Sequence, residues 1–125
     1  MIVGTGVDLA EVHRIRESIE RFGDRFLRRI YTEREIAYVQ RKANKFERYA
    51  ARFAAKEAGM KALGTGWRGG IQWKDFEVRN LPSGRPTLLL HGEAARIAAE
   101  LEVTSIHLSL THTATDALAH VIFEK

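Results

Sequence analysis

The stretch that decides the fold covers residues 52–64 and reads RFAAKEAGMKALG. Ala, Leu, Lys, Glu, Arg and Met dominate it, and these residues favour an α-helix. Its apolar positions cover most of the helix circumference, which is typical of a buried helix. Charged residues are almost never fully buried unless they are paired, yet the helix carries Arg52, Lys56, Glu57 and Lys61. The sequence therefore predicts a central helix whose charges either form a solvated pair, Glu57 with Lys61 one turn on, or line a site for a phosphorylated ligand.

A second carboxylate lies near the N-terminus, where residues 1–9 read MIVGTGVDL. Alternation of side chains along a strand puts Gly4, Gly6 and Asp8 on one face. Glycines inside a strand often mark close approach by a ligand or by another backbone. We therefore expect a bare, exposed strand surface that leads to Asp8. Asp8 has an alternative role as the N-cap of the following helix, because aspartate is a favoured N-cap residue.

The remaining pattern predicts an α+β fold in which an antiparallel β-sheet packs around the long central helix. Strands joined by hairpins indicate the antiparallel arrangement, and Thr32 and Glu35 have the spacing of a capping box. Helices are expected at residues 9–22, 25–29, 32–43, 45–63 and 92–102. Strands are expected at residues 1–8, 72–79, 86–91, 105–113 and 117–123.

Composition limits the function classes. A chain of 125 residues fits one domain with a modest core. It has no cysteine, which excludes disulfides and thiolate metal sites and suits a reducing cytosol. No apolar run approaches the ~20 residues of a membrane span, and the N-terminus lacks the pattern of a signal peptide. The net charge of +4 favours an anionic partner.

Arginine is concentrated in the first third of the chain. Phe22, Phe26 and Ile30 recur among the arginines at helical spacing, which is typical of a stripe that faces the core. The arginines would then form a separate face that could dock an acidic protein helix. Nucleic acid is the competing partner, but the chain has no RNP motif, zinc finger or clear helix-turn-helix to read it.

Four stretches of the chain, in this order, resemble the signatures of the bacterial holo-acyl-carrier-protein synthases, a class of 4′-phosphopantetheinyl transferase. They are GTGVDL at 4–9 followed by Arg14 and Ile15, FAAKEA at 53–58 with KALGTG at 61–66, GRP at 84–86, and SLTHT at 109–113. The resemblance covers essentially the whole chain, and the second signature is the most specific. It implies one transferase domain over residues 1–125 and a role in cytoplasmic fatty-acid biosynthesis. The implied reaction moves 4′-phosphopantetheine from coenzyme A to a serine of acyl carrier protein and releases adenosine 3′,5′-bisphosphate.

The resemblance also implies the site residues. Asp8 and Glu57 would bind Mg²⁺, which accepts one or two carboxylates together with waters and substrate oxygens. Lys61 would contact a phosphate oxygen as a point charge. The general base is either Glu57, acting through a water on the metal, or deprotonated Lys61. The residues expected to contact coenzyme A are Arg52, Lys61, Gly64, Gly66, Pro86 and His112.

Acyl carrier proteins are acidic, so the resemblance gives the arginine-rich segment a target. The residues that match the family's docking positions are Arg14, Arg21, Arg25, Phe26 and Arg29. A homotrimer with sites between subunits is implied, and neither a nucleic-acid nor a membrane partner is expected. Two alternatives stay open: a different Mg²⁺-dependent phosphoryl or pyrophosphate enzyme, and a basic nucleic-acid-binding module.

Overall fold

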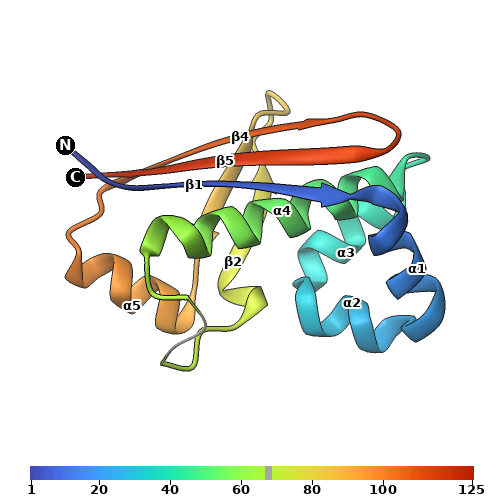
Figure 1. Cartoon of the computed structure of the whole chain (residues 1–125), viewed down its shortest axis with the longest axis horizontal. Helices are drawn as coiled ribbons and strands as arrows, with labels where there is room; N and C mark the ends of the chain where they lie inside the picture. The colour runs from blue at the N-terminus through green and yellow to red at the C-terminus, as the bar shows by residue number, and fades with distance from the viewer. Residues whose placement is uncertain (67–68) are drawn as a thin grey trace.

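The structure is a computed structural model that describes residues 1–66 and 69–125. A three-stranded antiparallel sheet lies along one side of the long helix α4 (Lys45–Leu63) (Figure 1). The order of its strands is β1 (Ile2–Glu11), β5 (Asp116–Glu124) and β4 (Ser105–His112). The first and last strands are therefore neighbours, and both termini lie at the same end of the molecule. The predicted α+β arrangement around a central helix is confirmed.

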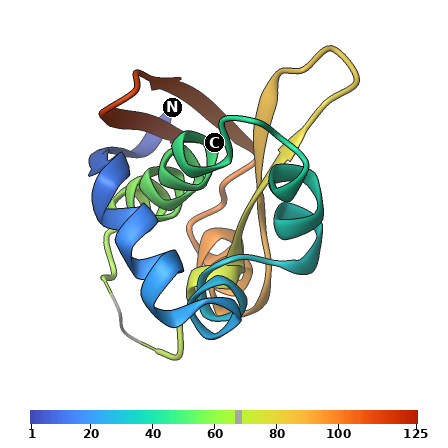
Figure 2. The same ribbon diagram turned by 90° about the vertical axis from the view of Figure 1, so that its right-hand side faces the viewer.

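The other elements cover the opposite side of α4. A second antiparallel sheet consists of β2 (Phe76–Asn80) and β3 (Pro86–Leu90), whose connecting turn projects from the body (Figure 2). The helices around α4 are α1 (Val12–Phe22), α2 (Asp24–Ile30), α3 (Glu33–Gln40) and α5 (Gly92–Glu100). The chain thus forms two sheets where the sequence pattern suggested one. Within the described ranges, no helix is long and apolar enough to cross a membrane.

Small residues allow α4 to pack closely against β1. A Cβ atom added at Gly4 would lie 2.0 Å from the carbonyl oxygen of Ala62, and one at Gly6 would lie 1.9 Å from that of Ala58. The glycine face of β1 therefore rests on the backbone of α4. The expectation of an exposed bare surface is wrong, because here the glycines admit another backbone.

The opposite side of α4 is packed just as closely. A Cβ atom added at Gly59 would lie 2.8 Å from Phe76 Cδ1 in β2, which explains a glycine in the middle of a helix. Lys56 is fully buried and its Nζ donates to Glu35 Oε1 at 2.7 Å. Burial lowers the pKa of Lys56, while the Glu35 carboxylate raises it. Lys56 is thus part of the core and does not line a ligand site.

Several boundaries differ from the sequence-based prediction. β1 continues to Glu11 because β5 pairs with it throughout, for example Leu9 with Leu118. α1 consequently begins at Val12 rather than at residue 9, and Asp8 lies within the strand instead of capping a helix. β2 begins at Phe76, since Trp73–Asp75 forms a short 3₁₀ turn. The capping box of Thr32 and Glu35 is present, but α3 ends at Gln40 rather than at residue 43.

Candidate active site

The close packing of β1 on α4 brings three predicted site residues together. Lys61 Nζ donates to Asp8 Oδ1 at 2.9 Å and to the carbonyl oxygen of Val7 at 3.0 Å. Glu57 lies one turn before Lys61 on α4, but the ion pair of Lys61 is with Asp8. The cluster is therefore built from two elements that are distant in the sequence, and the expectation of a simple Glu57–Lys61 pair is wrong.

The two carboxylates of the cluster repel each other. Partial burial raises the pKa of Glu57, the charge of Asp8 raises it further, and Lys61 lowers it. A divalent cation would relieve this repulsion, and a hard cation such as Mg²⁺ prefers a sparse set of carboxylate ligands. Among the described residues there is no cluster of three or more His, Cys, Asp or Glu side chains that would form a fuller metal cage. Asp8 and Glu57 thus fit a metal that keeps open positions for water and substrate.

An open hollow of about 320 Å³ adjoins this cluster. It is lined by Glu57, Met60, Lys61, Gly64 and Gly66. Gly64 ends α4 in the left-handed conformation, with φ of 76°, which a residue with a side chain adopts only at a cost. The loop can therefore turn sharply beside the carboxylates and leave room for a ligand.

Arg52 faces a different hollow. It lies five residues before Glu57, which corresponds to a rotation of about 140° around the helix. Its guanidinium donates from Nη2 to Asn80 Oδ1 at 2.7 Å, and the side chain is 3% exposed. Among the described residues, Arg52 lines a hollow of about 170 Å³ that is different from the one lined by Glu57 and Lys61.

Two other residues expected to contact coenzyme A, Pro86 and His112, lie on the strands β3 and β4. Pro86 begins β3 and pairs in register with Asn80. His112 ends β4, and its Nδ1 lies 3.2 Å from Glu47 Oε2 in the first turn of α4. Arg52, Pro86 and His112 therefore lie at different places on one chain from the Asp8–Glu57–Lys61 cluster.

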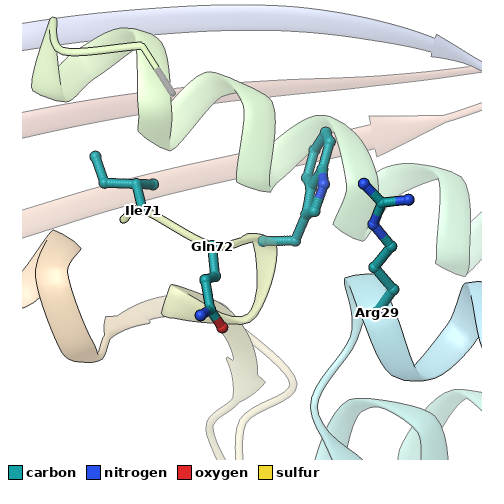
Figure 3. Close-up of a pocket in the computed structure, with 4 residues that line it drawn as sticks. Arg29, Ile71 and Gln72 are labelled. Atoms are coloured by element: carbon teal, nitrogen blue, oxygen red, sulfur yellow. The ribbon is translucent and has the colours of Figure 1, made fainter. Parts of the chain in front are cut away.

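Four of the five expected docking residues, which come from α1 and α2, line adjacent hollows. Arg14 and Phe26 line one of about 340 Å³, and Arg25, Phe26 and Arg29 line the next, of about 460 Å³. Arg29 also borders a third hollow, of about 450 Å³, together with Ile71 and Gln72 (Figure 3). Arg21 is exposed, with its guanidinium 5.2 Å from the centre of the Phe22 ring. We call these three hollows, with their apolar floor and arginine rim, the arginine groove.

Two residues that the sequence pattern did not single out for these sites, Phe53 and Asn80, also contact them. Phe53 stacks on Trp73 with ring centroids 4.9 Å apart, and Phe53 also lines the first hollow of the arginine groove. Asn80 holds the Arg52 guanidinium from the end of β2. Asn80 is one of three polar residues in β2, so no signal in the sequence singled it out or paired it with Arg52.

The chain is similar in sequence and in structure to known proteins of one family. Residues 4–119 match the 4′-phosphopantetheinyl transferase superfamily. The chain is 73% identical over 124 residues to the holo-[acyl-carrier-protein] synthase of Solibacter usitatus, with 99% of each chain covered. The crystal structure of the holo-[acyl-carrier-protein] synthase from Neisseria meningitidis superposes with a TM-score of 0.90, at 32% identity and with all of both chains covered.

A further similar structure contains a ligand. It is a holo-(acyl-carrier-protein) synthase from Bacillus anthracis in complex with coenzyme A (3′,5′-ADP), with a TM-score of 0.79 and 37% identity over 98% of this chain and 96% of that one. This chain therefore belongs to the 4′-phosphopantetheinyl transferase superfamily and, within it, to the family of the holo-[acyl-carrier-protein] synthases.

Proposed function

We propose that this protein transfers 4′-phosphopantetheine from coenzyme A to a serine hydroxyl of apo-acyl carrier protein. The observation that carries the proposal is the cluster of Asp8, Glu57 and Lys61 beside an open, glycine-lined hollow. Transfer of a phosphoryl-type group requires neutralised charge on the pyrophosphate and a nucleophile held in line. In this proposal Asp8 and Glu57 bind Mg²⁺, which would neutralise developing charge on the pyrophosphate.

The chain's own residues then carry out the proton transfer and charge stabilisation. The serine oxygen forms a bond to the phosphorus attached to pantetheine, and the bond from that phosphorus to the bridging oxygen breaks. Adenosine 3′,5′-bisphosphate leaves, and the serine proton passes to the Glu57 carboxylate. Lys61 already donates to two acceptors and so acts as a cation toward the phosphates. Glu57 is the proposed base because its carboxylate lines the hollow where the nucleophile would bind, and a base must lie within hydrogen-bond reach of the proton it accepts.

We further propose that the working form is a homotrimer. The outer face of the three-stranded sheet exposes apolar side chains, with Val7 51%, Leu9 61% and Leu118 36% exposed. Leu9 and Leu118 are in register on neighbouring strands, so the apolar area is continuous. A contiguous exposed apolar patch favours a protein interface. A closed trimer that forms through this sheet would also allow Arg52 of one subunit and Glu57 of another to bind opposite ends of one coenzyme A molecule.

The arginine groove is the proposed docking site for the carrier protein. Arg14, Arg25 and Arg29 supply positive charge at its rim, and Phe26 supplies an apolar contact. Charge complementarity of this kind mainly raises the association rate and selects the partner.

Titration calorimetry with coenzyme A tests the proposed function against its alternatives. We expect coenzyme A to bind more tightly in the presence of Mg²⁺ than in EDTA, and random oligonucleotides not to bind at physiological salt. Salt-sensitive binding of the oligonucleotides without binding of coenzyme A would instead support a nucleic-acid module. Binding of pyrophosphate but not of coenzyme A would support another Mg²⁺-dependent enzyme.

A further inference from the structure

Arg52 is a buried cation with no direct ion pair to a carboxylate in the part of the chain that the structure describes. Its side chain is 3% exposed, and within residues 1–66 and 69–125 no carboxylate lies within ion-pair distance of it. Among the described residues its Nε has no hydrogen-bond partner, and its guanidinium carbon lies 5.0 Å from the centre of the Tyr38 ring. Burial lowers the pKa of Arg52, and the charge of Glu35 partly offsets this effect. Because an unpaired buried charge is costly, the position is suited to an anion that arrives with the ligand.

The hollow beside Arg52 suits an anion of limited size. It has a volume of about 170 Å³ and is lined by Arg34, Arg52 and Arg79 together with Tyr38, Val78 and Asn80. A lining that contains three arginines favours a doubly charged phosphate monoester, because the planar fork of arginine matches phosphate oxygens. Under the proposed function, this monoester is the ribose phosphate of coenzyme A.

Asn80 joins Arg52 to the tip of the β2–β3 hairpin. Its Oδ1 accepts from Arg52 Nη2 at 2.7 Å, and its Nδ2 donates to the carbonyl oxygen of Gly84 at 3.0 Å. A guanidinium only donates and a carbonyl oxygen only accepts, so a side-chain amide is the group that satisfies both. Asn80 is also in register with Pro86, the hairpin residue expected to contact coenzyme A.

We propose that Asn80 is a positioning residue for coenzyme A. It fixes the Arg52 fork relative to the turn that carries Gly84 and Pro86, so that both present a preformed surface to the ribose phosphate. Asn80 itself touches neither the reacting phosphorus nor the carrier protein. The inference rests on the proposed function and deepens it, because it names the residue that orients the Arg52 guanidinium toward the end of coenzyme A remote from the chemistry.

Steady-state kinetics with coenzyme A and with 3′-dephospho-coenzyme A test this role. We expect Asn80→Ala to raise the KM for coenzyme A about tenfold, the typical effect of losing a hydrogen bond to a charged group. The kcat and the KM for apo-acyl carrier protein should stay unchanged, and the preference for coenzyme A over its 3′-dephospho form should fall by the same factor. In an Arg52→Ala background, Asn80→Ala should not change this preference further.

Two further variants distinguish a specific effect of the Asn80 amide from a general effect on the hairpin. Thr87→Val is the matched control, since Thr87 Oγ1 donates to the carbonyl oxygen of Arg79 in the same hairpin, and it should leave both KM values unchanged. Asn80→Asp keeps the acceptor for Arg52 but loses the donor to Gly84 and adds a charge that competes with phosphate. It should therefore bind coenzyme A less well than Asn80→Ala does.

The outcomes distinguish failure of this inference from failure of the proposed function. If the parent protein transfers phosphopantetheine but Asn80→Ala raises the KM for both coenzyme A forms equally, Asn80 only stabilises the hairpin and the inference is wrong. An Asn80→Ala protein with parental kinetics overturns it as well. If the parent protein itself transfers nothing, the proposed function has failed.

Discussion

At the scale of single residues, the proposed chemistry depends on Asp8 and Glu57, the two carboxylates of the cluster that adjoins the open hollow. We predict that Asp8→Asn and Glu57→Gln each lower kcat/KM at least about a hundredfold, since metal-ion stabilisation is worth several kcal/mol and about 1.36 kcal/mol corresponds to tenfold. Circular dichroism should show an intact fold. The control is Glu102→Gln, at an exposed glutamate near the C-terminal end of α5. Transfer at the parental rate by either site variant, without added metal, would refute the assignment.

The raised pKa of Glu57 has a consequence for stability. A carboxyl group whose pKa is higher in the folded state binds more protons there, so stability falls as the pH rises from the ordinary glutamate pKa through the raised one. In EDTA, Glu57→Gln should therefore raise the melting temperature at pH 7, and this gain should vanish below about pH 4, near the ordinary pKa of glutamate. Differential scanning calorimetry at both pH values measures it. A melting temperature at pH 7 that is equal to or below that of the parent contradicts the prediction.

At the scale of elements, the contact between β1 and α4 holds the site together. Gly6→Ala should lower the free energy of unfolding by about 3 kcal/mol, at the upper end of overpacking effects, because the added methyl group meets the Ala58 carbonyl. Thr5→Val, on the exposed face of the same strand, should change it by less than about 1 kcal/mol. Urea denaturation measures both. If Gly6→Ala is as stable as the parent, the backbone approach is not a requirement of the fold.

The helices α1 and α2 supply the arginine rim of the groove. Charge reversal at Arg14 or Arg21 should raise the KM for the carrier protein about tenfold at low salt and leave the KM for coenzyme A unchanged. The effect should shrink as salt is added, because exposed charges are screened beyond about 10 Å at 0.1 M. Lys125→Glu, at the opposite end of the molecule (Figure 1), is the control. Equal losses for both substrates would mean that the reversal damages the fold.

Some of this arrangement could be predicted from local sequence. Helical spacing and the family signatures identified Asp8, Glu57 and Lys61, and the structure brings these residues together. The orientation of Arg52 could not be predicted, because a helix that is apolar on nearly all sides does not indicate which neighbour each charge will face. The end of β1 was also missed, since its last residues are held by pairing with β5, more than a hundred positions away.

At the scale of the whole molecule, Arg52 and Asp8 lie apart on one chain, so mixing two variants can test whether the proposed site lies between subunits. We expect Asp8→Ala subunits, which are inactive, and Arg52→Ala subunits, which bind coenzyme A weakly, to gain activity at low coenzyme A concentration when they are refolded together, because the proposed mixed trimer would contain intact sites between subunits. With random mixing, about a quarter of the sites would combine both parental residues. A mixture no more active than its separate components would show that one chain supplies both residues. Light scattering provides the control, and a fully active monomer would exclude the trimer.

The most direct measurement is the intact mass of an apo-acyl carrier protein after incubation with this protein, coenzyme A and Mg²⁺. The account predicts that the carrier gains one 4′-phosphopantetheine group on its serine, that adenosine 3′,5′-bisphosphate appears in equal amount, and that EDTA or Asp8→Asn abolishes both. An unchanged carrier mass in the presence of Mg²⁺, with well-folded protein and carrier, would contradict it.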